Sequence, residues 1–198
     1  MSDWIVVHTV IRITLAYFHA NNNNNNNNRR LASKCANSFG TNRLRPYFYP
    51  HQRGVGTPGG CEATVHSTRR YLENLPPDHV LVKLDFSNAF SSIHRREMLL
   101  SVHERIPELY AFCRSAYSYS QPSCLFFGPY IVSSEEGAQQ GDPVGPLLFC
   151  NTIHPLLSSL KSNLNLGYLD DVTLGGTVKT VASDGRNYQG RRFVPQCV

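Results

Sequence analysis

The chain has 198 residues, of which 41% are hydrophobic and 17% are charged. This composition provides the core of one domain of ordinary size or slightly more, and it excludes wholesale disorder. The net charge of +5 is unevenly placed: residues 1–83 carry ten Lys and Arg against four acids, and residues 84–198 carry nine against ten. A basic half beside a half with clustered Asp suggests a polyanion partner and a cation site, although a solvated basic face explains the excess almost as well.

The sequence predicts an intracellular protein without a membrane partner. No apolar run is long enough to span a bilayer. A signal peptide is not expected, because Asp3 stands where a basic start would be and Arg12 and two histidines interrupt the apolar stretch that follows. The six cysteines form no CxxC pair and no zinc-like spacing with His. We therefore expect free thiols in a reducing compartment, the nucleus or the cytoplasm, rather than secretion.

The first part of the chain divides at an asparagine tract. Residues 21–28 are eight consecutive Asn, which cannot form a packed core, so residues 1–28 are expected to be a disordered or foreign leader. A short helix is predicted from Arg29 and is expected to end at Gly40, followed by a loop over residues 41–60. The glycines of this loop match GxGxxG only weakly, because no strand precedes them and Pro58 interrupts them. Another helix, stopped by two prolines, is predicted after the loop.

A strand and then a helix are predicted around Asp85. Residues 80–84 are β-branched and apolar, as in a buried strand, and from Ser87 onward apolar residues recur at roughly helical spacing. Asp85 thus lies where the strand passes into the helix. The apolar positions of the helix are Phe90, Ile93, Met98, Leu99 and Val102.

The second half alternates helices with hairpins. A helix over residues 107–118 precedes a hairpin over 123–134 that turns at Gly128 and Pro129. A polar, Gly-rich loop leads to a long apolar helix. The hairpin LGYLDDVTLGG follows over residues 166–176, and the tail after it has no periodicity.

This order of elements predicts an α+β fold and a cluster of carboxylates. It can bring Asp85, at the end of a strand, beside Asp170 and Asp171, at the tip of a hairpin. Taken separately, Asp85 could cap a helix and the Asp pair could form a turn. Together they would repel unless a cation lay between them, and hard oxygen ligands suit Mg²⁺. Two such ions roughly 3.5–4 Å apart are the apparatus for in-line displacement at phosphorus.

Three motifs then resemble those of a known family. LVKLDFSNAF, GAQQGDPVGPLLF and GYLDDV look like the central palm motifs of reverse transcriptases, in the same order and at similar spacing. The sequences LDFSNAF and QGDP are most similar to the corresponding motifs of non-long-terminal-repeat (LINE-like) retrotransposons. The resemblance covers roughly residues 29–183, and three ordered motifs are far more specific than a lone YxDD.

The resemblance implies a role for each matching residue. Asp85 and Asp170 would bind two Mg²⁺ ions, with Mn²⁺ as an alternative, and Asp171 would support them. The carbonyl of Phe86 would be a further metal ligand. Phe90 resembles the aromatic residue that selects deoxynucleotides by excluding a 2′-OH, although a core residue fits that position equally well.

Further residues are implied in substrate and nucleic-acid binding. Gln140 and Gly141 resemble the loop that contacts the dNTP and the template backbone, although QGDP alone would be an ordinary turn. Arg43, Arg45 and Arg53 interleave with aromatics, and we expect them to grip template phosphates while the aromatics stack on bases. A solvated basic loop explains this last pattern as well.

The implied architecture is a polymerase palm, an antiparallel sheet with helices on one face, with partial fingers and no thumb. We assign residues 1–28 to the leader, 29–78 to partial fingers, 79–183 to the palm and 184–198 to an irregular tail. The implied reaction is RNA-directed DNA synthesis from dNTPs on an RNA template and a DNA primer, in retrotransposition.

We expect the chain to be a truncated piece of its element, because the family's triphosphate-binding strand and primer grip have no counterpart in it. The alternative is a catalytically inactive remnant that at most binds nucleic acid. An RNA-templated RNA polymerase is a third interpretation, against which Phe90 argues. The sequence does not predict an oligomeric state.

Overall fold

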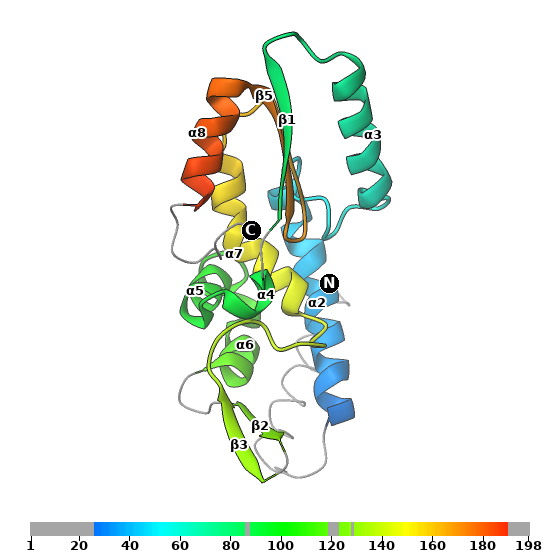
Figure 1. The fold of residues 1–198 in the computed structure, drawn as a ribbon. Coiled ribbons are helices and arrows are strands. Elements are labelled where there is room, and N and C mark those ends of the chain that lie inside the picture. Colours follow the sequence, from blue (N-terminus) through cyan, green and yellow to red (C-terminus); the bar gives the residue numbers. More distant parts are fainter. Residues whose placement is uncertain (1–25, 86–87, 119–122, 128, 190–198) are drawn as a thin grey trace.

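Helices and antiparallel sheets are combined in this chain, which confirms the predicted α+β class (Figure 1). The computed structural model describes residues 26–85, 88–118, 123–127 and 129–189. Its elements are α2 (Asn26–Phe48), α3 (Gly60–Glu73), β1 (His79–Leu84), α4 (Ala89–Ser92), α5 (Arg95–Arg105), the 3-10 helix η1 (Pro107–Leu109), α6 (Tyr110–Tyr117), β2 (Ser123–Phe127), β3 (Tyr130–Ser134), α7 (Gly145–Ser159), β4 (Leu164–Tyr168), β5 (Asp171–Thr177) and α8 (Val178–Gln189).

A three-stranded antiparallel sheet in the order β1-β5-β4 forms one end of the molecule (Figure 1). Neighbouring residues of a strand point to opposite faces, and β5 has helices on both. A Cβ at Gly175 would meet Tyr71 of α3, whereas a Cβ at Gly176 would meet Val181 of α8. The expectation that helices pack on one face only is therefore wrong, because α3 covers the face opposite α8.

The central element of the core is α7, the long apolar helix that the sequence predicts. Ten of its fifteen residues are buried, and it contacts α2, α4, α5 and β4. A helix with apolar residues all round must be covered on all sides. Pro155 is tolerated inside α7 and is exposed to solvent. The predicted β2–β3 hairpin projects from the end of the molecule opposite the three-stranded sheet (Figure 1).

Helix α2 is longer than predicted and continues through Gly40 to Phe48. The expected stop is wrong because Gly40 serves in packing and not in termination. A Cβ at this position would lie 2.4 Å from Leu147 Cδ2 of α7, so glycine allows the two helices to approach closely. Arg43 and Arg45 consequently lie on a helix and not in the loop that was expected.

The single helix expected after Asp85 is divided into α4 and α5. Ile93 and His94 have extended backbone conformations between them. The loop before α7 provides the reason, since Ala138 N donates to Phe90 O at 2.8 Å and Gly137 N donates to Ile93 O at 3.0 Å. These bonds satisfy carbonyls that a continuous helix would otherwise use.

The tail is helical rather than irregular as far as Gln189, and residues 190–198 lie outside the described part of the chain. Asp184 anchors this helix, α8, to the turn before β4. Its buried carboxylate accepts hydrogen bonds from Lys161 N at 2.9 Å, Ser162 N at 2.8 Å and Ser162 Oγ at 2.6 Å.

Within the described residues, no helix has both the length and the apolar character needed to cross a bilayer. The cysteines that the structure reports as free thiols are Cys35, Cys61, Cys113 and Cys150.

Two helical glycines make a matched pair for testing the packing of α2. Gly40→Ala is expected to lower the free energy of unfolding by about 1–3 kcal/mol, because the new methyl group overpacks the contact with Leu147. A Cβ at Gly185 in α8 would meet nothing within 4 Å, so Gly185→Ala is expected to raise stability by about 0.5–1 kcal/mol. Urea denaturation of both variants measures the two effects, and a stabilising Gly40→Ala would contradict the packing role.

Candidate active site

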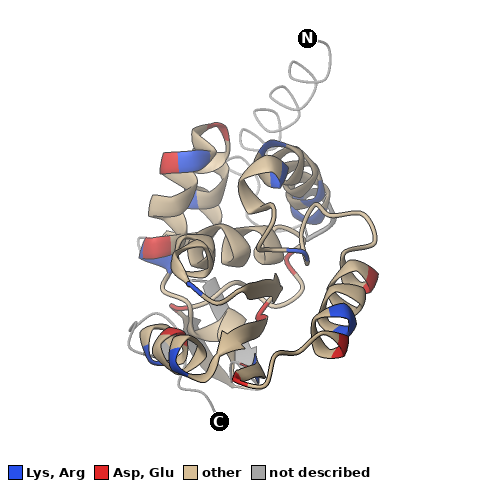
Figure 2. Cartoon of the chain, turned by 90° about the horizontal axis from the view of Figure 1, so that it is seen from above, with Lys and Arg blue, Asp and Glu red and all other residues tan. Residues whose placement is uncertain are grey.

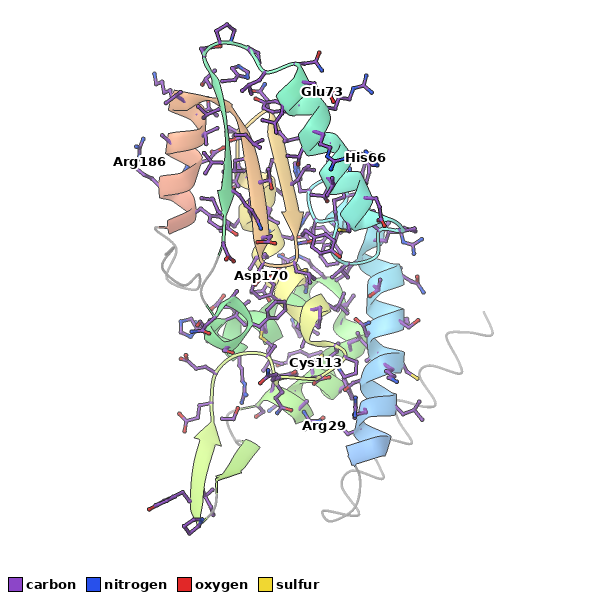
Figure 3. All side chains as sticks on the ribbon, turned by 45° about the vertical axis from the view of Figure 1, so that its right-hand side comes forward. Arg29, His66, Glu73, Cys113, Asp170 and Arg186 are labelled. Carbon is purple, nitrogen blue, oxygen red and sulfur yellow. The ribbon has the colours of Figure 1, made fainter. Side chains whose placement is uncertain are left out.

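The sheet brings the three predicted aspartates to one of its ends. Leu84 pairs with Val172, so the same register carried one residue further sets Asp85 opposite Asp171. Tyr168 pairs with Asp171 across the hairpin, which leaves Leu169 and Asp170 as a two-residue turn. Figure 3 shows Asp170 at this end of the sheet, directed toward the helical part of the molecule.

The electrostatics of Asp170 reflect this arrangement. Burial raises the pKa of Asp170, and the neighbouring carboxylates of Asp171 and Asp85 raise it further, whereas a backbone hydrogen bond and Lys83 act in the opposite direction. Asp171 forms an ion pair with Lys83, with Nζ 3.1 Å from Oδ1, and both side chains are substantially exposed. The three acids therefore interact as like charges, with one lysine offsetting part of the repulsion.

The carboxylates have the right chemistry for a hard divalent cation but are not gathered into a closed coordination shell. Among the described residues, no group of three or more His, Cys, Asp and Glu side chains is arranged to hold a metal ion. The Asp171 carboxylate is instead paired with Lys83. Phe86, expected to supply a carbonyl ligand, lies outside the described residues.

A cavity of about 600 Å³ is lined by three of the four residues predicted to bind substrate, and the fourth, Phe86, lies outside the described residues. Phe90 of α4 lines it on one side, and Gln140 and Gly141 of the loop before α7 line it on the other. Gly141 has a φ of +81°, a conformation that glycine adopts readily. The Phe90 ring also stacks on Phe149 of α7 with centroids 4.5 Å apart, so the expected core role and the lining role coexist.

Helix α7 connects the cavity to the aspartates. Phe149 packs against Phe90 at the cavity, and the next residue, Cys150, is within electrostatic reach of Asp170. Burial raises the pKa of the Cys150 thiol, and the charge of Asp170 raises it further, so this cysteine stays protonated. The two groups of predicted site residues thus lie near consecutive residues of one buried helix.

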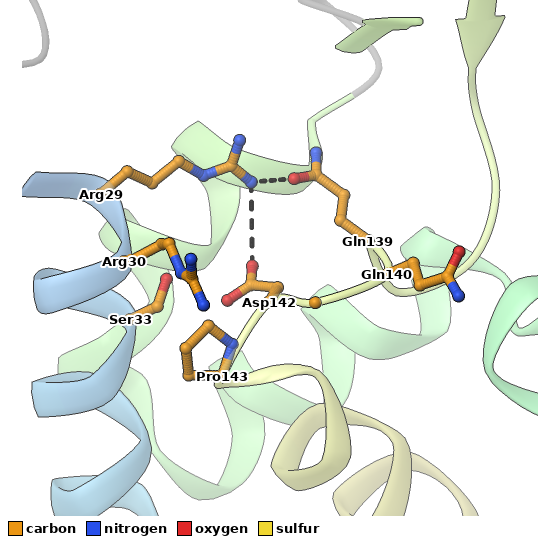
Figure 4. Close-up of a pocket in the computed structure, with 8 residues that line it drawn as sticks. Arg29, Arg30, Ser33, Gln139, Gln140, Asp142 and Pro143 are labelled. Carbon is orange, nitrogen blue, oxygen red and sulfur yellow. Dashed lines mark hydrogen bonds and ion pairs between the residues drawn. The ribbon is translucent and has the colours of Figure 1, made fainter. Parts of the chain in front are cut away.

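A second cavity, of about 350 Å³, lies on the α2 side of the same loop. Arg29 and Arg30 of α2 line it together with Gln140 and Gly141 (Figure 4). Arg29 donates to the side-chain oxygen of Gln139, and its Nη2 lies 3.7 Å from the carboxylate of Asp142.

Asp142 holds this loop against two further elements. Its carboxylate accepts a hydrogen bond from Tyr117 of α6 at 2.7 Å and another from Val144 N at 3.2 Å. Together with the Arg29 ion pair, these bonds fix the loop against α2, α6 and the start of α7. The QGDP segment is therefore more than an ordinary turn.

The three arginines predicted to bind nucleic acid have different surroundings. Arg43 lies 3.9 Å from Glu108 of η1, and Arg53 stacks over the ring of Tyr49 at 4.8 Å, while Arg45 is exposed near the end of α2. All five charged residues of α2 are basic. Figure 2 shows this helix with the colour of Lys and Arg and without that of Asp and Glu.

The three aromatic residues among these arginines, Tyr47, Phe48 and Tyr49, differ in burial, which the sequence pattern did not indicate. Phe48 is buried, and Tyr47 packs against the ring of His154 with centroids 4.3 Å apart. Burial lowers the pKa of His154 to about 4, so this histidine is a neutral member of the α2–α7 contact at neutral pH. Tyr49 is 64% exposed, so its ring is the most accessible of the three.

Sequence reasoning missed several residues that support the site. Gln52, Arg29 and Tyr117 contact site elements far away in the chain, and no motif or periodicity marks them. Gln52 stands two residues before the weak glycine pattern of residues 54–59, in which Gly54 allows close packing against Leu169. The one feature that marks Gln52 is that it is a polar residue buried in a loop, and the loop sequence does not reveal this burial.

Comparison with known proteins identifies one family. Residues 21–186, which are 166 of the 198 residues, match the model of a family described as reverse transcriptase (RNA-dependent DNA polymerase). The match includes the three aspartates, Phe90 and the Gln140–Gly141 loop. A comparison with curated protein sequences returns no match.

Removing the charge of Asp170 and removing that of Asp184 should change the free energy of unfolding in opposite directions. Asp170→Asn is expected to raise the free energy of unfolding by less than about 1 kcal/mol at pH 7 in EDTA, because it removes like-charge repulsion that solvent partly screens. Asp184→Asn is expected to lower it by about 1–3 kcal/mol, because Asp184 accepts three hydrogen bonds.

The pH dependence of the Asp170→Asn effect has a defined sign. The pKa of Asp170 is raised in the folded state, so the effect is absent below the unfolded value of 3.8 and grows as the pH rises through the folded value. Thermal unfolding between pH 3 and pH 8 measures it, and a destabilising Asp170→Asn across this range would contradict the repulsion.

Proposed function

Because this chain belongs to the reverse transcriptase family, we propose that it is an RNA-directed DNA polymerase domain that joins a dNTP to a primer 3′-OH. One observation carries the proposal: three interacting aspartates lie at the end of the sheet, beside the helix that lines a cavity containing Phe90, Gln140 and Gly141. In this proposal the sheet and α7 form the palm, and α2 and α3 belong to the fingers.

Asp85 and Asp170 would hold two Mg²⁺ ions, or Mn²⁺, with Asp171 and the Phe86 carbonyl in support. Bound metal of this kind activates a hydroxyl nucleophile and neutralises a triphosphate. The like charges around Asp170 favour a bound cation, which would relieve their repulsion. The ion pair of Asp171 with Lys83 is largely exposed, and such pairs contribute little, so it would be readily exchanged for a metal bond.

The cavity of about 600 Å³ would hold the incoming nucleotide. The Phe90 ring is fixed by its stack on Phe149, so it can exclude a 2′-OH without moving. Gly141 has no side chain, which allows a nucleotide or a template backbone to approach the loop closely. The protein thus contributes position and charge rather than covalent chemistry.

RNA template and DNA primer would contact the basic helix α2 and the loop that follows it. Five basic residues and no acidic ones lie on α2, and the exposed Tyr49 ring is available for stacking beneath Arg53. The LDFSNAF and QGDP motifs support an origin in a non-long-terminal-repeat retrotransposon. Sequencing the flanking genomic DNA tests that origin, and flanking long terminal repeats would contradict it.

Primer extension tests the proposed activity directly. The protein is expected to extend a DNA primer on an RNA template in the presence of Mg²⁺ and dNTPs, and Asp170→Ala is expected to lower the rate by at least about a thousandfold. EDTA is expected to have the same effect. Incorporation of labelled dNTP measures both.

The matched control is Asp184→Asn, which changes an aspartate in α8 that only anchors the fold. It should retain Mg²⁺-dependent extension at a temperature where it is folded. Salt-sensitive binding of RNA without any extension would instead identify a catalytically inactive nucleic-acid-binding protein.

Replacing Phe90 tests the choice of sugar. Phe90→Ala is expected to reduce the preference for dNTPs over rNTPs by roughly tenfold to hundredfold, because the ring that excludes the 2′-OH is removed. Phe149→Leu removes the ring on which Phe90 stacks but keeps the Phe90 ring, so it should reduce this ratio less than Phe90→Ala does. Ratios of kcat/KM for the two nucleotides measure the effect, and an unchanged ratio in Phe90→Ala would exclude the selective role.

A further inference from the structure

A buried glutamine lies against the turn that carries Asp170. Gln52 is in the loop between α2 and α3, and its side chain is fully buried, with a relative exposure of 0%. A buried amide requires hydrogen-bond partners, because an unpaired polar group in the core is destabilising. All of its partners in the described structure are backbone groups of its own loop and of Leu169.

The loop forms a short extension of the sheet along β4. Gly167 N donates to His51 O at 2.7 Å, and Arg53 N donates to Gly167 O at 2.7 Å, so Gln52 and Gly167 pair as a parallel bridge. Glycine at position 54 allows the two segments to touch, since a Cβ there would lie 2.5 Å from Leu169 N. Backbone pairing between the segments stops at this point because β4 ends at Tyr168.

The side-chain amide of Gln52 continues the pairing where the strand ends. Its Oε1 accepts hydrogen bonds from Leu169 N at 2.9 Å and from Gly54 N at 2.8 Å, and its Nε2 donates to Leu169 O at 3.1 Å. Both backbone polar groups of Leu169 are therefore held by one side chain. A carboxamide is suited to this role because it offers a donor and an acceptor side by side.

Leu169 needs such support because its φ is +57°. A bulky L-residue rarely adopts this conformation, which costs free energy and persists only where surrounding contacts impose it. Asp170 follows directly, so the conformation of Leu169 sets the direction in which the Asp170 carboxylate leaves the hairpin. A small change in this direction would displace the carboxylate relative to Asp85.

We propose that Gln52 is a positioning residue for the reaction, which holds the Leu169–Asp170 turn in its strained conformation through both backbone groups of Leu169. This inference rests on the proposed polymerase activity for its effect on catalysis. The contact itself is independent of that activity and can be measured without it.

Steady-state primer extension tests the catalytic effect. Gln52→Ala is expected to lower kcat by about tenfold to a hundredfold, while the dNTP KM changes by less than about threefold, because the metal-binding carboxylate is misplaced and the nucleotide cavity is not. Gln52→Glu keeps the acceptor but sets an oxygen against the Leu169 carbonyl, so it should be impaired as well. A kcat within about twofold of wild type in Gln52→Ala would overturn the proposal.

Rescue by glycine separates positioning from a general loss of stability. Leu169→Gly adopts positive φ without strain. In the Leu169→Gly background, Gln52→Ala should therefore cost at least about fivefold less in kcat than it does in wild type. The control is Asn165→Ala, which removes a different buried side-chain amide, one in β4 that donates to Leu157 O at 2.6 Å. Leu169→Gly should not restore any kcat that Asn165→Ala loses. Equal losses in both backgrounds would show that Gln52 acts only through stability.

Amide hydrogen exchange decides the matter even if the wild-type chain does not extend a primer. In Gln52→Ala the Leu169 and Gly54 amides should exchange at least about tenfold faster. The Lys161 and Ser162 amides, which are held by Asp184, should be unchanged. If the wild-type protein does not extend a primer but shows this exchange pattern, the polymerase activity is rejected and the contact between Gln52 and Leu169 is confirmed. If the exchange rate of the Leu169 amide is unchanged in Gln52→Ala, the role of Gln52 is rejected. If Gln52→Ala does not fold, as judged by circular dichroism, Gln52→Glu is measured in its place.

Discussion

The site depends on one constraint, the register of the antiparallel sheet, which holds like charges together. Pairing of Leu84 with Val172 and of Tyr168 with Asp171 leaves no choice about which residues meet at the end of the strands. Backbone hydrogen bonds along β1, β5 and β4 together outweigh the repulsion among three carboxylates. Burial raises the pKa of Asp170 in the folded protein, and the repulsion from Asp171 and Asp85 raises it further.

The helices fix the position of the cavity of about 600 Å³ relative to this end of the sheet. Helix α7 is buried on nearly every side, so it cannot shift without disturbing α2, α5 and the sheet together. Phe149 and Cys150 on this helix face the cavity residue Phe90 and the charge of Asp170, respectively. Asp142, bound by Arg29 and Tyr117, then fixes the loop that closes the other side of the cavity. This packing therefore holds the cavity at a fixed distance from the carboxylates.

The predicted elements succeeded where periodicity was strong and failed where a distant segment intervened. The strand before Asp85, the apolar helix and both hairpins were confirmed, because strand-forming residues, apolar runs and turn residues are features of the local sequence. The strand before Asp85 is half-buried, however, and not buried as expected. The stop at Gly40 was wrong because Leu147, more than a hundred residues away, needs that space. The uninterrupted helix through Ile93 was wrong because Gly137 N competes for its carbonyl.

By itself the sequence determined the α+β class, the family motifs and the identity of the three aspartates, because these depend on residue type and spacing along the chain. Only the tertiary structure decided that Phe90 and Gln140 line one cavity, that Tyr47 and Phe48 belong to the core, and that Gln52 holds the aspartate turn. These facts depend on contacts between segments up to 117 residues apart. No local pattern encodes such contacts, since a buried amide and an exposed one have the same letter in the sequence.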